Sequence, residues 1–305
     1  MHDLIIIGGG PAALSAGIYA GRKQINTLLL TKDWGGQMQW TNRIENYPGF
    51  SKVSGQDLIE KMVDHFKENT GDFVKIQKEV EVKEITKEEK IFNISLDDNL
   101  YQSKSVLVAT GRRPKKLGVK GEDEFANKGV SYCPICDGPV FKDKEVAVIG
   151  GGNAALESAL DLLSYCPKVY ILEFMDKLTA DEVLINEVKN NSKIEILTNV
   201  EVKEIRGENF VGGLVYEDRD NKKTQEVKVE GVFISIGSVA NSDFIKNMLE
   251  LNENGEIKVG KNNKTSQDGV FASGDCTNIR YKQIIIAAGE GAKAALEASR
   301  YLSGL

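Results

Sequence analysis

The sequence predicts an α/β protein with two Rossmann-like nucleotide-binding domains, each with three layers (ββα), and two observations support this prediction. The first is an internal repeat: residues 5–21 read IIIGGGPAALSAGIYAG and residues 147–163 read AVIGGGNAALESALDLL. Both copies join an apolar strand to an Ala/Leu-rich helix through Gly-x-Gly-x-x-Ala. The second is length, because 305 residues are long for one hydrophobic core and comfortable for two.

The glycines of each copy have a physical purpose. They permit a tight turn and let a pyrophosphate approach the backbone at a helix N-terminus, where peptide N–H groups and the helix dipole favour an anion. These glycines are Gly8 and Gly10 in the first copy and Gly150 and Gly152 in the second. One such motif is a weak signal, but two that are both framed by a strand and a helix are a strong one.

After its glycine motif, each copy continues through the same series of elements: a second strand, a polar β-meander and an apolar strand that runs into glycine. In the first copy these are residues 27–31, 73–101 and 106–111. In the second copy they are residues 169–172, 194–229 and 232–237. An Ala-rich helix over 284–302 follows. We therefore expect one discontinuous domain of residues 1–113 and 243–305, with a second domain, 114–242, inserted between its halves.

Composition excludes several classes of function. The net charge of −6 argues against a nucleic-acid partner, and no apolar run is long enough to span a bilayer. The first residues enter a strand at once, without a cationic leader, so we expect a cytoplasmic protein. Four cysteines are too few for a disulfide scaffold, and two histidines without paired soft ligands predict no metal site.

Two of the cysteines form the motif Cys133-Pro-Ile-Cys136. A two-residue spacer lets two thiols close a small, reversible disulfide, and Pro134 suits the first turn of a helix. A cysteine at a helix N-terminus has a lowered pKa and is more reactive as a thiolate. The pair is therefore expected to be redox-active, whereas Cys166 and Cys276 are isolated and receive no role.

At this point the chain resembles the low-molecular-weight thioredoxin reductases over essentially its whole length. The shared motifs are the first glycine motif, Gly35-Gly36-Gln37, residues 44–50 (IENYPGF), Ala109-Thr110-Gly111, Cys133-Pro-Ile-Cys-Asp137, Gly274-Asp275 and Tyr281-Lys-Gln283. The resemblance implies a fold of the pyridine nucleotide-disulfide oxidoreductase type, an FAD cofactor and a homodimer. It implies an enzyme that passes two electrons from FAD through the Cys133–Cys136 pair to the disulfide of thioredoxin.

The resemblance also assigns roles within the redox motif. Cys136 is the cysteine nearest the flavin, Cys133 attacks the substrate disulfide, and Asp137 is placed to shuttle a proton between thiol and reduced flavin. Because one disulfide cannot face a buried flavin and a protein partner together, we expect two domain orientations, with bending at residues 112–114 and 240–243.

The same resemblance implies which residues bind FAD in the discontinuous domain. For Asn46 and Thr110 a purely structural role is equally compatible with the sequence. The expected FAD-binding residues are Gly8, Gly10, Pro11, Ala12, Ala13, Thr31, Gly36, Gln37, Asn46, Ala109, Thr110, Gly111, Gly274, Asp275, Lys282, Gln283 and Ile284.

The second glycine motif departs from the family pattern. NADPH-dependent members follow the second strand with His-Arg-Arg-x-x-x-Arg, whose arginines hold the 2′-phosphate. Here the matching positions are Glu173, Phe174, Met175 and Thr179, and Ala154 replaces a hydroxyl residue in the glycine motif. Guanidinium groups suit a phosphate, and a carboxylate repels it. We therefore expect reduced ferredoxin, rather than NADPH, as the electron donor.

Other donors and other functions remain open. Glu173 lies where an acid binds the ribose of NAD, so NADH is the nearest rival, and NADPH is a further alternative. A dithiol oxidase and a non-catalytic, redox-sensing flavoprotein are the other interpretations. An alkyl hydroperoxide reductase flavoprotein is disfavoured because it carries an extra N-terminal disulfide domain. A ferredoxin would need a local basic face, for which the candidates are Arg112, Arg113, Lys115, Lys116, Lys142 and Lys144.

Overall fold

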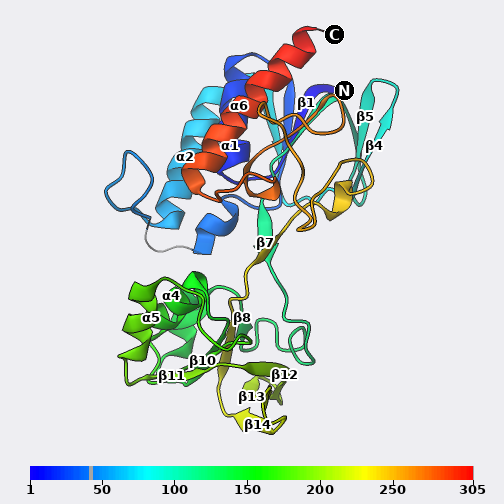
Figure 1. Cartoon of the computed structure of the whole chain (residues 1–305). Helices are drawn as coiled ribbons and strands as arrows, with labels where there is room; N and C mark the ends of the chain where they lie inside the picture. The colour runs from blue at the N-terminus through cyan, green and yellow to red at the C-terminus, as the bar shows by residue number, and fades with distance from the viewer. Residues whose placement is uncertain (41–43, 305) are drawn as a thin grey trace. The chain divides into compact units, whose positions relative to one another are not determined.

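The chain divides into two compact units (Figure 1). The computed structural model describes residues 1–40 and 44–304, without the side chains of Trp40, Ile135 and Cys136. Unit 1 comprises Met1–Arg113 and Val239–Leu305, and unit 2 comprises Pro114–Ser238. The chain thus returns to unit 1 at Val239, whereas the sequence analysis placed this boundary at residue 243.

Unit 1 is built on a seven-stranded sheet with the order β3-β2-β1-β6-β5-β4, in which β17 also pairs with β6. The strands β1, β2, β3, β6 and β17 are parallel, and β4 and β5 are antiparallel to their neighbours. The elements are β1 (His2–Ile7), α1 (Pro11–Arg22), β2 (Thr27–Leu30), α2 (Gly55–Thr70), β3 (Val74–Gln77), β4 (Glu84–Glu88), β5 (Ile91–Ser95), β6 (Leu100–Val108), β17 (Val270–Ala272) and α6 (Ile284–Ser303).

The apolar run of β1 is buried on both faces of this sheet, as expected for a central parallel strand. Leu4 and Ile6 pack with residues of α1, α2 and α6, which cover one face (Figure 1). Ile5 and Ile7 pack into a second core with Phe92 and residues of the opposite face. The last helix, α6, lies beside α1, so the first and the last helix of the chain belong to the same layer.

Unit 2 repeats this plan on a smaller scale. A five-stranded parallel sheet has the order β11-β10-β9-β15-β8, and a separate antiparallel sheet has the order β12-β13-β14. The elements are β8 (Val130–Ser131), α3 (Pro134–Asp137), β9 (Val146–Ile149), α4 (Asn153–Leu162), β10 (Val169–Leu172), α5 (Glu182–Lys189), β11 (Ile194–Leu197), β12 (Val200–Gly207), β13 (Val211–Asp218), β14 (Thr224–Val227) and β15 (Gly231–Ile234).

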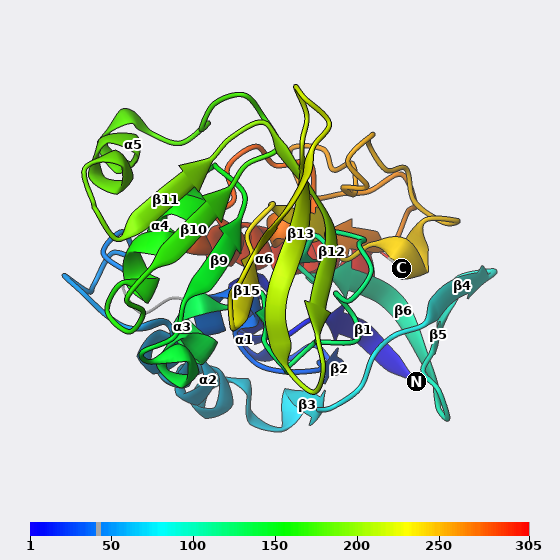
Figure 2. The same cartoon turned by 90° about the horizontal axis from the view of Figure 1, so that it is seen from below.

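Strand β9 shows why unit 2 has three layers. Val146 and Val148 belong to the core beneath α4 and α5, whereas Ala147 and Ile149 face the core shared with β12–β14. Figure 2 shows the helices on one side of the parallel sheet and β12–β14 on the other. The prediction of two Rossmann-like, three-layer domains is confirmed.

One detail of the sequence analysis was wrong. The first strand of each predicted meander, β3 or β11, instead pairs in parallel with the second strand of its copy. Period-two alternation identifies a strand but does not reveal the direction of its neighbour.

The segments that join the two units pair with each other as a two-stranded sheet of β7 (Arg112–Pro114) and β16 (Ser238–Ala240).

Among the described helices, none combines the length and the apolar character that a membrane crossing requires.

Candidate active site

The first glycine loop is packed tightly against its neighbours. The N–H of Gly8 donates to the carbonyl of Leu30 at 2.8 Å, and a Cβ at Gly8 would collide with the carbonyl of Ala109. A Cβ at Gly9 would collide with the Thr31 hydroxyl, whereas Gly10 has open space around the position of a Cβ. The loop therefore brings the predicted residues Ala109 and Thr31 beside an open, glycine-lined helix start.

The segment before α6 completes this site in unit 1. A Cβ at Gly274 would lie 3.0 Å from the Cβ of Ala12, so the Gly274-Asp275 turn lies against the start of α1. Burial raises the pKa of Asp275 above its usual range. Gln37 donates to Asp275 Oδ2 at 3.5 Å, a long contact that leaves most of the carboxylate's acceptor capacity free.

Four more of the predicted FAD residues make contacts within unit 1. Asn46 Nδ2 donates to Gln283 Oε1 at 3.1 Å. Lys282 forms an ion pair with Glu256 at 3.0 Å. The hydroxyl of Thr110 donates to the carbonyl of Asn241 at 2.6 Å, which gives this side chain a structural role beside the joining segments.

These features fit a dinucleotide. Helix α1 starts after Gly10 with no side chain capping its N-terminus, and Pro11 occupies the first turn. The first peptide N–H groups of the helix are thus left for an anion, and the bare glycines allow a pyrophosphate to approach. Asp275 adds an acceptor suited to hydroxyl groups.

The second glycine loop repeats the first. Gly150 N–H donates to the carbonyl of Leu172 at 2.8 Å, and a Cβ at Gly150 would collide with the carbonyl of Ser235. Helix α4 also begins without a side-chain cap, directly after Gly152. This loop therefore presents the same cradle for a second nucleotide.

The carboxylate of Glu173 lies at the second glycine loop. It follows the last residue of β10, is buried, and accepts a hydrogen bond from the N–H of Met175 at 2.7 Å. A Cβ at Gly151 would lie 2.5 Å from Glu173 Oε2, so the carboxylate lies directly on the middle glycine of the loop. At this place an acid accepts from a ribose hydroxyl and repels a 2′-phosphate.

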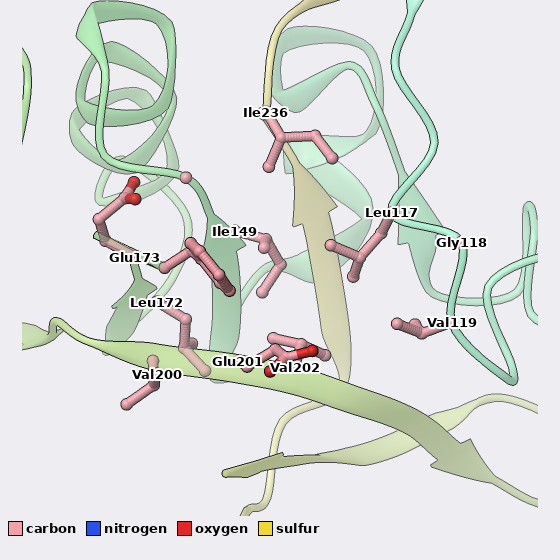
Figure 3. A pocket seen from close by; sticks show the side chains of 12 residues that line it. Leu117, Gly118, Val119, Ile149, Leu172, Glu173, Val200, Glu201, Val202 and Ile236 are labelled. Carbon is pink, nitrogen blue, oxygen red and sulfur yellow. The ribbon is translucent and has the colours of Figure 1, made fainter. Parts of the chain in front are cut away.

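A cavity of about 360 Å³ opens beside this carboxylate. Figure 3 shows Glu173 on one side of the cavity and Leu117, Gly118 and Val119 on the other. Its remaining walls come from the glycine loop, the strand ends and the antiparallel layer, namely Ile149, Gly150, Leu172, Phe174, Val200, Glu201, Val202 and Ile236. A mostly apolar cavity with a glycine loop and two acids, Glu173 and Glu201, suits a nucleotide.

The tertiary structure brings one cation to this site that sequence reasoning missed. Arg219, from the turn after β13, stacks on the exposed ring of Phe174 at 3.9 Å. Its guanidinium donates to the Phe174 carbonyl at 2.9 Å and to Asn199 Oδ1 at 3.1 Å. No local sequence pattern connects Arg219 with the end of β10, because 45 residues separate it from Phe174.

The redox motif follows β8. Cys133 is buried and disulfide-bonded, whereas Cys166 and Cys276 are free thiols. The side chain of Cys136 lies outside the described residues, so its predicted role rests on sequence. In the described part of the chain, no group of three His, Cys, Asp or Glu residues could hold a metal ion.

Ser131 holds the predicted proton shuttle in place, another contact that sequence reasoning missed. Its hydroxyl accepts from the N–H of Cys133 at 3.0 Å and lies 2.5 Å from Asp137 Oδ2, to which it donates. The N–H of Asp137 in turn donates to the Cys133 carbonyl at 3.1 Å. The carboxylate is thus fixed at the end of α3, the single helical turn that directly follows Cys133.

Two solved structures with the same fold are thioredoxin reductases. The enzyme from Lactococcus lactis is 34% identical, with a TM-score of 0.91 and full coverage of both chains. The enzyme from T. acidophilum is 37% identical, with a TM-score of 0.87, covering 99% of this chain and 98% of that one.

Curated relatives carry other names and are longer. An "NADH dehydrogenase" of Ferdinandcohnia aciditolerans is 44% identical over 98% of this chain, and a subunit of alkyl hydroperoxide reductase from Staphylococcus aureus is 39% identical over 99%. This chain spans only 57% and 59% of their lengths.

The family described as pyridine nucleotide-disulphide oxidoreductase matches residues 2–291. The chain belongs to this family, and within it to the low-molecular-weight thioredoxin reductase family of FAD-binding flavoproteins.

Proposed function

We propose that this protein is a flavoprotein disulfide reductase that takes electrons from NADH and delivers them through Cys133 and Cys136 to the disulfide of thioredoxin. The observation that supports NADH is the Glu173 carboxylate on the second glycine loop. It offers an acceptor to a ribose hydroxyl and like-charge repulsion to a 2′-phosphate. The two relatives named NADH dehydrogenase, at 44% and 42% identity, agree with this donor.

The residues of unit 1 that surround the first glycine loop would hold FAD. The N-terminus of α1 would receive the pyrophosphate, and Asp275 would accept from hydroxyl groups of the cofactor. FAD, when bound, carries electron pairs between a nicotinamide nucleotide and a disulfide. The other predicted FAD residues, from Gly8 to Ile284, stay proposals of the same kind.

The cysteines would complete the transfer. Two electrons and two protons convert the Cys133–Cys136 disulfide to a dithiol. The Cys133 thiolate then attacks one sulfur of the partner disulfide, which forms a mixed disulfide and releases the partner's other sulfur as a thiolate. The Cys136 thiolate attacks the Cys133 sulfur of this mixed disulfide, so that the reduced partner leaves and the Cys133–Cys136 disulfide is restored. Asp137, held by Ser131, is positioned to exchange a proton with this pair.

Ferredoxin remains a prediction without a supporting contact. Three of the cations proposed for a basic docking face are already paired with acids. Arg112 pairs with Glu256 at 2.7 Å, Arg113 with Asp243 at 2.5 Å and Lys116 with Asp123 at 2.5 Å. Such pairs weaken the positive field that an acidic protein would need.

The decisive experiment mixes the oxidised holoprotein anaerobically with NADH, NADPH or reduced ferredoxin and follows the flavin absorbance. We expect rapid bleaching by NADH at micromolar concentration and much slower bleaching by NADPH. Bleaching by ferredoxin alone would replace NADH by the donor predicted from the sequence. No bleaching by any donor would favour the redox-sensing alternative.

A second candidate concerns the electron acceptor. Six of the curated relatives, 38–40% identical, are named as a subunit of alkyl hydroperoxide reductase. Electrons could therefore pass to a peroxide-reducing partner instead of thioredoxin. NADH-driven reduction of purified thioredoxin supports our proposal, and peroxide consumption only with a peroxidase partner supports the alternative. Peroxide release without any partner would indicate a dithiol oxidase.

A homodimer and a cytoplasmic location also remain predictions. Light scattering would test whether the protein is a homodimer.

A further inference from the structure

A buried carboxylate in unit 2 remains without a role in the proposed chemistry. Glu122 is 2% exposed and does not line the cavity beside Glu173. A buried carboxylate is costly unless hydrogen bonds satisfy it. Three donors surround this one, and they come from two different segments of the chain.

The first segment is the wall of the cavity. The N–H of Leu117 donates to Glu122 Oε1 at 2.8 Å, and the N–H of Gly118 donates to Oε2 at 2.6 Å. Gly118 has φ of +78°, a left-handed conformation that suits glycine and turns two successive N–H groups toward one anion. Leu117, Gly118 and Val119 are the side of the cavity that faces Glu173 (Figure 3).

The second segment joins the end of β8 to the redox pair. The hydroxyl of Tyr132 donates to Glu122 Oε1 at 2.6 Å, and Tyr132 is the residue directly before Cys133. Burial, with the neighbouring carboxylate, raises the pKa of Tyr132 far above its usual range, so the hydroxyl remains a donor. Tyr132, Leu117 and Val119 pack against the same hydrophobic core.

We propose that Glu122 is a positioning residue that shapes the NADH cavity from behind, by fixing residues 117–119 against the segment that enters the redox motif. This inference rests on the proposed NADH site. With Glu122 in place, the cavity wall keeps its shape before the nucleotide arrives. Without the Glu122 carboxylate, the N–H groups of Leu117 and Gly118 lose their acceptor. Residues 117–119 must then become ordered when NADH binds, and the free-energy cost of this ordering lowers the affinity for NADH.

The test is anaerobic stopped-flow reduction of the flavin over a range of NADH concentrations, with Glu122→Gln and Glu124→Gln as a matched pair. Glu124 is two residues away and exposed. We expect Glu122→Gln to raise the apparent Kd for NADH about tenfold, because charge-assisted hydrogen bonds are lost, and to leave the limiting rate within about twofold. Glu124→Gln should match the wild type in both.

A second variant guards against misfolding of the first. Tyr132→Phe removes only the hydroxyl and keeps both backbone hydrogen bonds to Glu122, so the Kd for NADH should rise about threefold. For every variant, thioredoxin reduction by photoreduced flavin should equal that of the wild type, because no nucleotide takes part. An unchanged Kd in Glu122→Gln, or an equal rise in Glu124→Gln, overturns this inference alone. A wild-type protein that does not bind NADH overturns the proposed donor and the inference together.

Discussion

The two glycine loops of this protein share their backbone and differ at the end of the second strand. In unit 1, Ile7 of β1 lies opposite Leu30 of β2, and in unit 2, Ile149 of β9 lies opposite Leu172 of β10. In both loops the first glycine lies against the carbonyl of the residue that directly follows a neighbouring strand, Ala109 after β6 and Ser235 after β15. The next residue after the second strand is Thr31 in one unit and Glu173 in the other.

This difference separates the residues that allow a pyrophosphate to bind from the residue that meets the ribose. The glycines and the helix start specify that a pyrophosphate can approach, and both loops supply them equally. The side chain at the strand end meets the ribose side of a nucleotide, and there the two units carry different residues, Thr31 and Glu173. The two middle glycines show the contrast directly. A Cβ at Gly9 would collide with the backbone carbonyl of Asp33, whereas the three atoms nearest to a Cβ at Gly151 all belong to the Glu173 side chain.

The largest effect is therefore expected from Gly9→Ala. Its methyl group has no space beside the Thr31 hydroxyl and a fixed carbonyl, so the apoprotein should lose about 2 kcal/mol of unfolding free energy, and FAD should be lost on purification. Urea unfolding of the apoprotein and the flavin-to-protein absorbance ratio measure both. Gly10→Ala is the control: its Cβ meets nothing, so FAD binding should weaken while apoprotein stability stays unchanged. Equal stability of the two variants would refute the packing argument.

Glu173→Ala is expected to have the next largest effect, and only on the nucleotide. Losing a charged acceptor for a ribose hydroxyl should raise the KM for NADH about 10- to 100-fold. Because the repulsion of a 2′-phosphate is lost as well, the preference for NADH over NADPH should shrink. FAD content should stay at the wild-type level. Steady-state kinetics with both nucleotides provide the measurement, and the exposed neighbour Asp176, changed to Asn, provides the control. An unaltered NADH/NADPH ratio would contradict the assignment of Glu173.

A smaller effect is expected from Ser131→Ala. Asp137 loses the hydroxyl that holds its carboxylate, so kcat should fall about fivefold while the KM for NADH stays unchanged. Ser131→Thr keeps the hydroxyl and should restore much of the rate. If kcat is unaffected, Asp137 does not need this contact.

The smallest effect concerns Asp275 in unit 1. Because burial raises its pKa in the folded state, the folded apoprotein binds the proton more tightly than the unfolded chain does. Its contribution to stability is thus present at low pH and is lost as pH rises through the folded-state pKa. Asp275→Asn should therefore gain stability over the wild type between pH 4 and 8, by less than about 1 kcal/mol. Urea unfolding of both apoproteins at several pH values measures this, and a difference that shrinks as pH rises would contradict the sign.

The fold could be predicted largely from the sequence, because both glycine motifs are local. A strand, three glycine positions and an amphipathic helix are contiguous, so their spacing alone identified each cradle. Strand direction was less accessible. The parallel pairing of β3 and β11 depends on residues far along the chain, and alternation of polarity does not encode it.

What the sequence by itself determined about this protein is the family and the FAD cofactor, through a resemblance carried by several short motifs, and the position of Glu173 at a strand end. Each of these motifs consists of residues that are close in the chain. Only the tertiary structure shows that the Glu173 carboxylate lies against Gly151 and that Arg219 stacks on Phe174. It also shows that Glu122 connects residues 117–119 with Tyr132. These contacts join segments from different turns, strands and layers. Their geometry follows from how the sheets pack, and no spacing along the chain specifies it.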